Sequence, residues 1–196
     1  MQQFLTILAK VWSIVCYPLW MPTIAMALYS RNAIGIGTTF FMTAMVPLMV
    51  ILLGIRRGHI ADIYIDNPSE RTLPYLYTML CYGVWCYFLW KVMHVAPFFL
   101  ASAIGGLVCL GLVTVVNLKW KISSHLAGIG GLIGGILAFF YYAGIMPSFS
   151  VLICLFLPVL LIMYARLYLR AHDEWQVIIG FIVGLCSTFL PSLLVC

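Results

Sequence analysis

Two apolar runs separated by a short charged turn decide the fold class of this chain. Residues 148–195 read SFSVLICLFLPVLLIMYARLYLRAHDEWQVIIGFIVGLCSTFLPSLLV. Each run, 148–165 and 175–195, is close to the about 20 residues that an α-helix needs to cross a hydrocarbon core of about 30 Å. Their apolarity is continuous rather than alternating, which favours helices over the strands of a barrel. The turn between the runs therefore places its charges and His172 at the edge of a membrane.

The rest of the chain has the same character. Of its 196 residues 65% are hydrophobic and 8% are charged, whereas soluble domains contain about 25% charged residues. The sequence predicts an all-α polytopic bundle of about seven transmembrane helices, with six as the alternative count, in one domain over 1–196. No Ala-x-Ala site follows the first apolar run, so we expect the first helix to be retained. The expected segments are 11–29, 37–55, 73–93, 97–117, 124–144, 148–165 and 175–195.

The basic residues are distributed unevenly over this predicted topology. One side holds Lys10, Arg56, Arg57, Arg71, Lys119, Lys121, Arg166 and Arg170, whereas the other holds Arg31 and Lys91. The positive-inside rule makes the first side cytoplasmic, and all five acidic residues lie on it too. We expect an integral protein of a bacterial inner membrane, with a cytoplasmic charged face and an external C-terminus. The net charge of +5 follows from this orientation and does not indicate nucleic-acid binding.

The seven cysteines do not indicate a metal site or a disulfide framework. They are scattered through the apolar segments and include no Cys-x-x-Cys pair. Small apolar packing is the expected role of such cysteines.

The turn at 165–176 carries a specific pattern. It resembles the third signature motif of the type 2 phosphatidic acid phosphatase superfamily, Ser-Arg-x(5)-His-x(3)-Asp followed by Val and Gly. Two positions depart from that motif, Ala165 in place of Ser and Gln176 in place of Asp. The residues that match it are Arg166, His172, Val177, Gly180 and Gly184.

A second element, KWKISSH at 119–125, opens the fifth apolar segment. It resembles the second motif of the same family, Pro-Ser-Gly-His, and retains Ser123 and His125. Ser123 is also a favourable N-cap, and a helix N-terminus presents unpaired N–H groups that suit a phosphate. The alternative is a capped helix that cationic residues anchor at the interface. Glycines follow both histidines at the spacing that lets membrane helices approach closely, so we predict that His125 and His172 share one site within 119–184.

The first motif of that family, Lys-x(6)-Arg-Pro, has only a partial counterpart. Arg71 and Pro74 lie in the long connection at 56–74, but Tyr64 occupies the place of the lysine. Lys119 or Lys121 would then provide the missing cation. Equally, the whole connection is an interfacial segment without a phosphate contact. Without Arg71, Lys121 and Arg166, the excess of basic residues is still five against two.

The resemblance implies a lipid phosphate phosphatase that acts through a phosphohistidine. His172 would be the nucleophile, and His125 would protonate the departing lipid alcohol. No metal or other cofactor is required, and the partners are a lipid phosphate and the membrane. The implied phosphate-binding residues are Arg166, Ser123, Ser124, Lys121 and Arg71.

Gln176 is the departure with chemical consequences. Residues four apart share a helix face, so its side-chain oxygen is expected to accept the Nδ1–H of His172 without supplying negative charge. Asp173 and Glu174 are expected to point elsewhere. A lower pKa of His172 follows, because a carboxylate beside an imidazole favours the charged ring.

Two alternatives follow from the same residues. A catalytically weak or inactive protein would bind or transport a lipid phosphate. A magnesium-dependent membrane prenyltransferase would instead use His59, Asp62 and Asp66, whose spacing lets them share one helix face.

Overall fold

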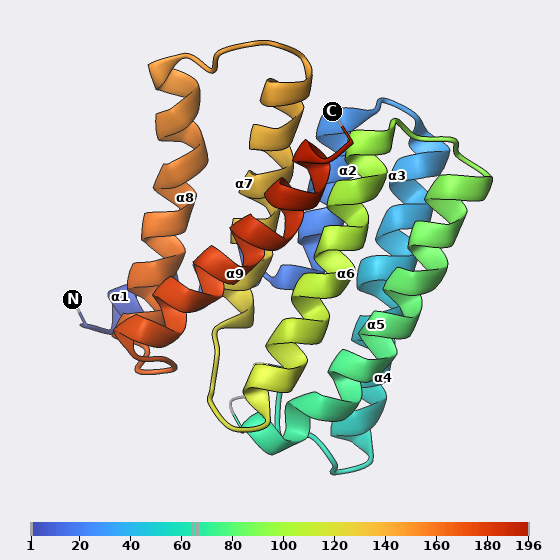
Figure 1. The fold of residues 1–196 in the computed structure, drawn as a ribbon. Coiled ribbons are helices and arrows are strands. Elements are labelled where there is room, and N and C mark those ends of the chain that lie inside the picture. The colour runs from blue at the N-terminus through green and yellow to red at the C-terminus, as the bar shows by residue number, and fades with distance from the viewer. Residues whose placement is uncertain (1, 64, 66, 196) are drawn as a thin grey trace.

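The structure, a computed structural model, describes residues 2–63, 65 and 67–195. This part of the chain is helical and contains no strand, so the predicted all-α class is confirmed. Figure 1 shows the helices side by side in one bundle, with α9 running obliquely across it. The helices are α1 (Gln2–Val15), α2 (Met21–Tyr29), α3 (Ala33–Phe40), α4 (Val46–Arg56), α5 (Pro68–Lys91), α6 (Pro97–Asn117), α7 (Ser124–Tyr142), α8 (Phe149–Tyr168) and α9 (Glu174–Leu193).

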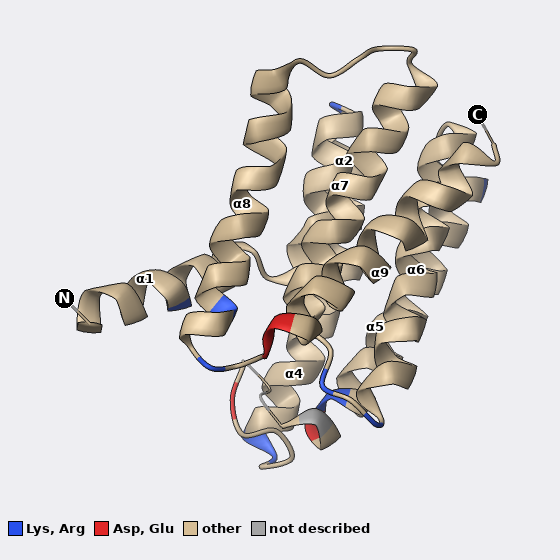
Figure 2. Cartoon of the chain, turned by 60° about the vertical axis from the view of Figure 1, so that its left-hand side comes forward, with Lys and Arg blue, Asp and Glu red and all other residues tan. Residues whose placement is uncertain are grey.

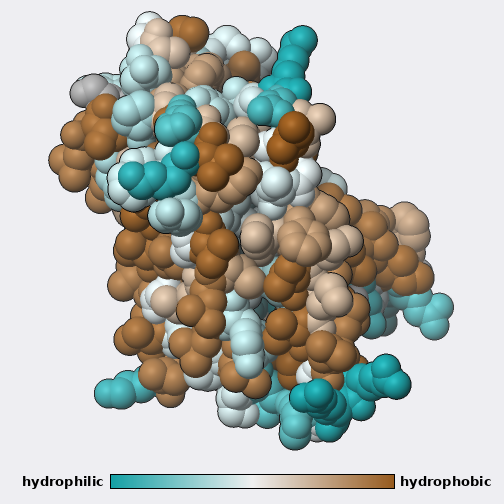
Figure 3. Space-filling model, turned by 90° about the vertical axis from the view of Figure 1, so that its right-hand side faces the viewer, coloured by the Kyte–Doolittle hydropathy of each residue, from teal (hydrophilic) through white to brown (hydrophobic). Residues whose placement is uncertain are grey.

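Within the described residues, six segments are long and apolar enough to span a membrane: Gln2–Tyr29, Ala33–Arg56, Pro97–Asn117, Ser124–Tyr142, Phe149–Tyr168 and Glu174–Leu193. The chain is therefore an integral multi-pass membrane protein. The predicted segment 73–93 corresponds to α5 up to its end at Lys91, and this helix has the length of a span and packs along α4 and α6. Its several tyrosines and tryptophans lower its apolarity. In Figure 3 a broad hydrophobic band separates two hydrophilic ends of the molecule.

The first predicted segment, 11–29, is not one continuous helix. α1 ends at Val15, and a short 3-10 turn, η1 (Pro18–Trp20), precedes α2. Tyr17 is extended, with φ −65° and ψ 133°, because a following proline disfavours the helical conformation. Figure 2 shows that α1 consequently projects sideways from the bundle. It packs against α8 instead of crossing beside the other helices.

The second predicted segment, 37–55, lies inside one helical run that contains a π-turn, η2 (Phe41–Met45), between α3 and α4. The Thr39 hydroxyl lies beside this turn and accepts a hydrogen bond from Trp85 Nε1 on α5, at 2.9 Å. This buried bond ties α3 to α5, so the wide turn occurs where two helices are joined by polar groups.

Glycines bring α7 and α9 into close contact. A Cβ added at Gly180 would lie 2.6 Å from the Ser123 carbonyl oxygen, and one at Gly184 would overlap the Ala127 carbonyl oxygen. Small residues at this spacing permit such an approach. The Ser123 N–H donates to the Gln176 carbonyl oxygen at 3.2 Å. The starts of the two helices that carry the motif histidines are therefore joined.

The charged residues gather at one end of the bundle. Figure 2 shows them at the end formed by the connections from α4 to α5, α6 to α7 and α8 to α9. Arg31 and Lys91 flank connections at the opposite end. The arrangement places the predicted site residues at the charged end, where the histidine-bearing turns meet.

Candidate functional site

The turn between α8 and α9 holds His172 in a network of side chains. His172 Nδ1 lies 2.9 Å from Gln176 Oε1, and Gln176 Nε2 donates to Asp173 Oδ2 at 2.7 Å. Asp173 also caps α9, because its Oδ1 accepts the Gln176 N–H at 2.8 Å. The predicted contact between Gln176 and His172 is present. Asp173 directs its two oxygens to Gln176 rather than to the His172 ring, in agreement with the expectation that it points elsewhere.

These bonds fix the tautomer of His172. A carboxylate only accepts hydrogen bonds, so Asp173 requires the NH₂ of Gln176 on its side and leaves Oε1 facing the imidazole. That oxygen also only accepts, so Nδ1 of His172 carries the proton. The other ring nitrogen, Nε2, then has a free lone pair. It is buried and has no hydrogen-bond partner within the described residues.

The surroundings of His172 keep its ring neutral. Burial lowers its pKa to about 3, and the nearby cations Arg166, Arg71 and Lys121 add to the shift, while the hydrogen bond with Gln176 opposes it. The direction agrees with the lower pKa predicted from the sequence. Its largest cause is desolvation rather than the missing carboxylate. A neutral imidazole is the nucleophilic form.

His125 lies close to His172 at the start of α7. Its side chain is 3% exposed, and its Nε2 also lacks a hydrogen-bond partner within the described part of the chain. The ring of Tyr17 packs edge-on against it, with ring centroids 5.4 Å apart. The shared position predicted for the two histidines is thus consistent with the hydrogen bond that joins Ser123 to Gln176.

Ser123 occupies the predicted N-cap position of α7 but does not cap the helix. Its backbone is extended there, with φ −83° and ψ 106°, yet its hydroxyl makes no capping bond. The Oγ atom is buried and unpartnered among the described atoms. The Ser123 side chain therefore leaves the first N–H groups of α7 uncapped.

Two arginines lie buried near these groups. Arg166, in the last turn of α8, is 1% exposed, and one guanidinium nitrogen donates to Ser13 Oγ at 3.5 Å. Arg71, in the first turns of α5, is 3% exposed. Its Nε donates to the Ile65 carbonyl oxygen at 2.6 Å, and its guanidinium reaches the Ile122 carbonyl oxygen at 3.4 Å. Arg71 thus binds the loop that precedes Ser123 and contributes to the electrostatic environment of His172.

The remaining predicted residues lie around this cluster or away from it. Ser124 and Lys121 are half-buried, and Lys121 contributes to the electrostatic environment of His172. His59 and Asp62 are exposed, and Asp62 accepts a hydrogen bond from the Ile65 N–H at 3.1 Å, which stabilises the loop. Asp66 and Tyr64 lie outside the described residues. No group of three or more His, Cys, Asp or Glu residues in the described part of the chain is placed to hold a metal ion.

A cavity of about 370 Å³ extends from this cluster into the apolar interior. Its polar end is lined by Tyr17, Arg71, Ser124 and His125, and its walls come from α2, α5, α6 and α7. His172, Arg166 and Ser123 do not line it. Arg71, Ser124 and His125 are therefore the predicted site residues through which the cavity meets the buried cluster.

Comparison with known proteins gives no independent identification, because no protein-family model, curated protein or solved structure matches this chain.

The sequence interpretation missed Ser13 and Tyr17. Both lie before the first motif and reach the site only because the chain turns at Pro18 and brings α1 against α8. Ser13 is separated from Arg166 by 153 residues. The pre-proline position of Tyr17 was the signal that would have located this turn.

Proposed function

We propose that this protein is a membrane-embedded lipid phosphate phosphatase that acts through a phosphohistidine. The observation that carries the proposal is the cluster of buried, unpartnered groups where α7 and α9 begin: Nε2 of His172, Nε2 of His125 and Oγ of Ser123, within the described residues. Leaving buried polar atoms without partners is unfavourable. Two imidazoles and two buried arginines together suit an anionic ligand that accepts several hydrogen bonds, such as a phosphate.

In this proposal, Nε2 of His172 attacks phosphorus and forms a P–N bond as the P–O bond to the lipid breaks. The bound phosphate dianion favours the protonated form of His125, and this imidazolium donates its proton to the departing alcohol oxygen. Water then attacks the phosphohistidine, gives its proton to His125, and the P–N bond breaks to release inorganic phosphate. Both histidines return to their starting states, so atoms and charges balance.

The cations and helix ends would hold the phosphate through these steps. Arg166 and Arg71 provide planar, multidentate donors that neutralise phosphate oxygens. Ser123, Ser124 and the first N–H groups of α7 add further donors, and Lys121 adds positive charge. These contacts stabilise charge as it develops on the phosphoryl group. The site is built from cations and imidazoles, so the proposed reaction proceeds without a divalent metal.

The proposed orientation places this site at the cytoplasmic face of a bacterial inner membrane. The excess of basic residues at the charged end supports it. A reporter that is active only outside the cytoplasm, fused after Cys196, is expected to be active. An inactive reporter, together with activity of a cytoplasmic reporter at the same position, contradicts this orientation.

Phosphate release from a panel of lipid phosphates and diphosphates by purified full-length protein tests the function. We expect release that is unaffected by excess EDTA and absent in the variant His172→Ala. Loss of activity on chelation, with recovery on adding magnesium, would favour the prenyltransferase alternative. Phosphate release at the wild-type rate by His172→Ala would contradict the proposed mechanism.

A second candidate is a lipid-phosphate binder without turnover. It is favoured by one observation: the cavity meets His125 and Arg71 but is not lined by His172. This candidate predicts saturable binding of an alkyl phosphate by wild-type protein without phosphate release.

A further inference from the structure

The cavity beside the cluster extends along α7, whose lining residues lie between Ser124 and Phe140. α7 lines it with one face, which includes His125, Gly128, Gly131 and Gly135. These glycines also allow close packing, because an added Cβ would lie 2.9 Å from Pro18 Cβ at Gly128 and 2.8 Å from Ser102 Oγ at Gly135. Two neighbouring glycines, 130 and 134, face α9 instead, where an added Cβ would overlap its backbone. The glycines of α7 therefore permit close packing against several elements, and some of them also line the cavity.

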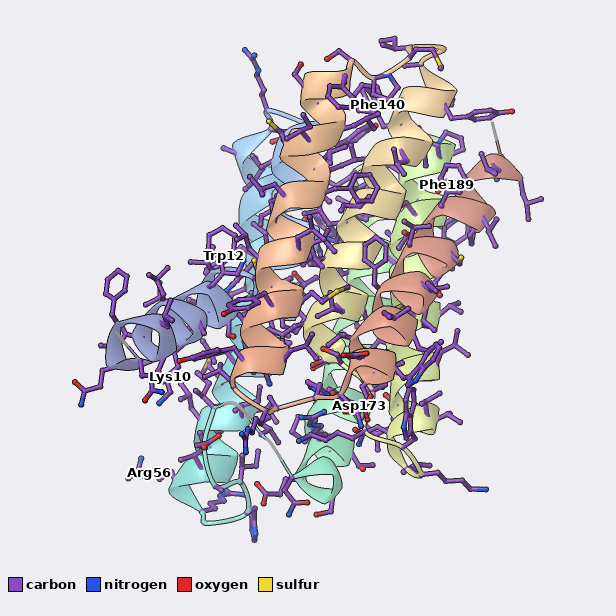
Figure 4. The ribbon with its side chains drawn as sticks, turned by 90° about the vertical axis from the view of Figure 1, so that its left-hand side faces the viewer. Lys10, Trp12, Arg56, Phe140, Asp173 and Phe189 are labelled. Atoms are coloured by element: carbon purple, nitrogen blue, oxygen red, sulfur yellow. The ribbon has the colours of Figure 1, made fainter. Side chains whose placement is uncertain are left out.

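The two ends of the cavity differ in chemistry. One end carries Arg71 and His125, and the far end is lined by aromatic residues, including Phe98 and Phe139. Phe98 also stacks on Tyr142, with ring centroids 4.6 Å apart. Figure 4 shows that Phe140, which also lines the cavity, and Asp173 lie toward opposite ends of the bundle. The cavity thus runs from the charged end toward the other side of the membrane.

From these observations we infer that the cavity binds one hydrocarbon chain, and that the protein selects single-chain lipid phosphates over two-chain ones. The inference rests on the proposed function for its catalytic consequence. A phosphate attached to the chain end would lie by Arg71 and His125 while the chain extends between α2, α5, α6 and α7. The cavity has a volume of about 370 Å³ and its cationic residues lie at one end. A second chain on the same headgroup would have to share this space with the first.

The helix geometry sets an approximate chain length. His125 and Phe139 are 14 residues apart on α7, which corresponds to about 21 Å at a rise of 1.5 Å per residue. An extended chain advances about 1.2 Å per bond, since three backbone bonds span at most about 3.6 Å. The cavity therefore accommodates about 17 extended bonds. This length exceeds half of a hydrocarbon core of about 30 Å.

The preference among lipids should depend on how well the lipid tail fits the cavity, and not on transfer of the tail out of water. A lipid tail leaves one apolar environment for another, so burial alone gives little selectivity. A side chain that fills the cavity removes the space for the tail and should discriminate between substrates with and without a chain. Gly106 on α6 offers such a position, because it lines the cavity and an added Cβ would meet only Tyr82 Cε1, at 3.6 Å.

The test compares Gly106→Leu with the matched variant Gly83→Leu in full-length protein. Gly83 lies in α5, does not line the cavity, and an added Cβ there meets nothing within 4 Å. Phosphate release is measured with hexadecyl phosphate, with a two-chain dihexadecanoyl phosphatidate, and with the chainless p-nitrophenyl phosphate. All three are presented at equal concentration in the same detergent.

For wild-type protein we expect hexadecyl phosphate to be hydrolysed at least tenfold faster than the two-chain lipid. In Gly106→Leu the ratio of hexadecyl to p-nitrophenyl phosphate activity should fall about tenfold, whereas Gly83→Leu should keep the wild-type ratio. Equal hydrolysis of the one-chain and two-chain lipids overturns the inference. So does an unchanged ratio in Gly106→Leu.

Binding separates failure of this inference from failure of the proposed function. A hexadecyl phosphate that carries a spin label near its chain end is added to the purified protein. We expect an immobilised signal with wild type and Gly83→Leu, and loss of that signal with Gly106→Leu. This pattern without phosphate release supports the cavity and rejects the phosphatase. Phosphate release without an immobilised signal supports the phosphatase and rejects the cavity.

Discussion

The helix starts that carry the two motif histidines are built in contrasting ways. At α9, Asp173 caps the helix and its second oxygen orients Gln176, which in turn fixes the proton of His172. At α7, Ser123 occupies the N-cap position without a capping bond, and both its Oγ and Nε2 of His125 lack partners within the described residues. One start is satisfied internally, and the other is left open.

This difference assigns different tasks to the two helix ends. The α9 end holds one imidazole in a single tautomer, which is the requirement for a nucleophile. The α7 end keeps donors available, which is the requirement for binding an anion. Both tasks depend on contact between the helices, because the Ser123 N–H donates to the Gln176 carbonyl oxygen. The predictions below separate the two ends.

The largest expected effects come from replacing the two histidines. Only the role of His125 depends on whether the leaving group needs a proton. His172→Ala should abolish phosphate release from every substrate, because the attacking nitrogen is removed. His125→Ala should lower release from an alkyl phosphate by about 10²–10⁴-fold, the usual contribution of general acid–base catalysis.

The leaving group provides the matched control. p-Nitrophenolate departs without protonation, so His125→Ala should still form the phosphohistidine with p-nitrophenyl phosphate, detectable as an initial burst of p-nitrophenol. A burst from His172→Ala, or equal losses in His125→Ala for both substrates, contradicts the assigned roles.

The next effect concerns the contact that joins the two ends. In Gly184→Ala the new Cβ would overlap the Ala127 carbonyl oxygen, so α7 and α9 must separate. Overpacking of this kind costs about 1–3 kcal/mol. We expect a lower Tm in detergent and a large loss of activity, whereas Gly83→Ala, whose Cβ meets nothing within 4 Å, serves as the control. Equal Tm values for both variants would show that the close approach is not required.

How far the sequence predicts this site depends on the range of each contact. Gln176 and His172 lie one helical turn apart, so their contact followed from spacing alone. Joining His125 to His172 needed only the glycines of α7 and α9. In contrast, Ser13 reaches Arg166 across 153 residues through the turn at Pro18. A hydropathy pattern assigns such a segment to one helix, since Pro is common in membrane helices.

The hydrogen-bond partners of Arg71 and Asp173 could not be predicted from the sequence for another reason. The fold at the charged end depends on hydrogen bonds to irregular backbone, such as those from Arg71 to the carbonyl oxygens of Ile65 and Ile122. The hydropathy pattern of a sequence does not indicate which carbonyl oxygen of a loop will accept a hydrogen bond. Asp173 was assigned by helical spacing, but it precedes the helix, and an N-cap residue is not subject to that spacing.

A smaller effect should appear in the pH dependence. Because His172 has a pKa of about 3, protonation of this ring should not reduce the wild-type rate between pH 7 and 4. A carboxylate at 176 would stabilise the imidazolium and raise that pKa, so the acid limb of the pH–rate profile should move to higher pH.

The variant must avoid a clash of like charges, because Gln176 Nε2 lies 2.7 Å from Asp173 Oδ2. Gln176→Glu is therefore combined with Asp173→Asn, so that the new asparagine amide can donate a hydrogen bond to the new glutamate carboxylate. Gln176→Ala provides the comparison without an acceptor, and it should lose activity at all pH values because the ring is free to rotate. Coincident pH profiles for wild type, the double variant and Gln176→Ala would show that residue 176 does not control the ring.

The smallest expected effect tests the contrast between the helix starts directly. Asp173→Ala removes the cap of α9 and should lower the free energy of unfolding by about 0.5–2 kcal/mol. Ser123→Ala removes no capping bond, so stability should change little while phosphate release falls. Asp173→Ser distinguishes the two duties of Asp173: a serine hydroxyl can still accept the N–H of residue 176, but it has no second oxygen for the Gln176 amide. We therefore expect Asp173→Ser to retain the wild-type Tm and to lose part of the activity, since the amide can then turn its NH₂ toward His172 and disfavour the reactive tautomer. Equal losses of stability in Ser123→Ala and Asp173→Ala would mean that Ser123 caps α7 after all, and that its start is no more open to a ligand than the start of α9.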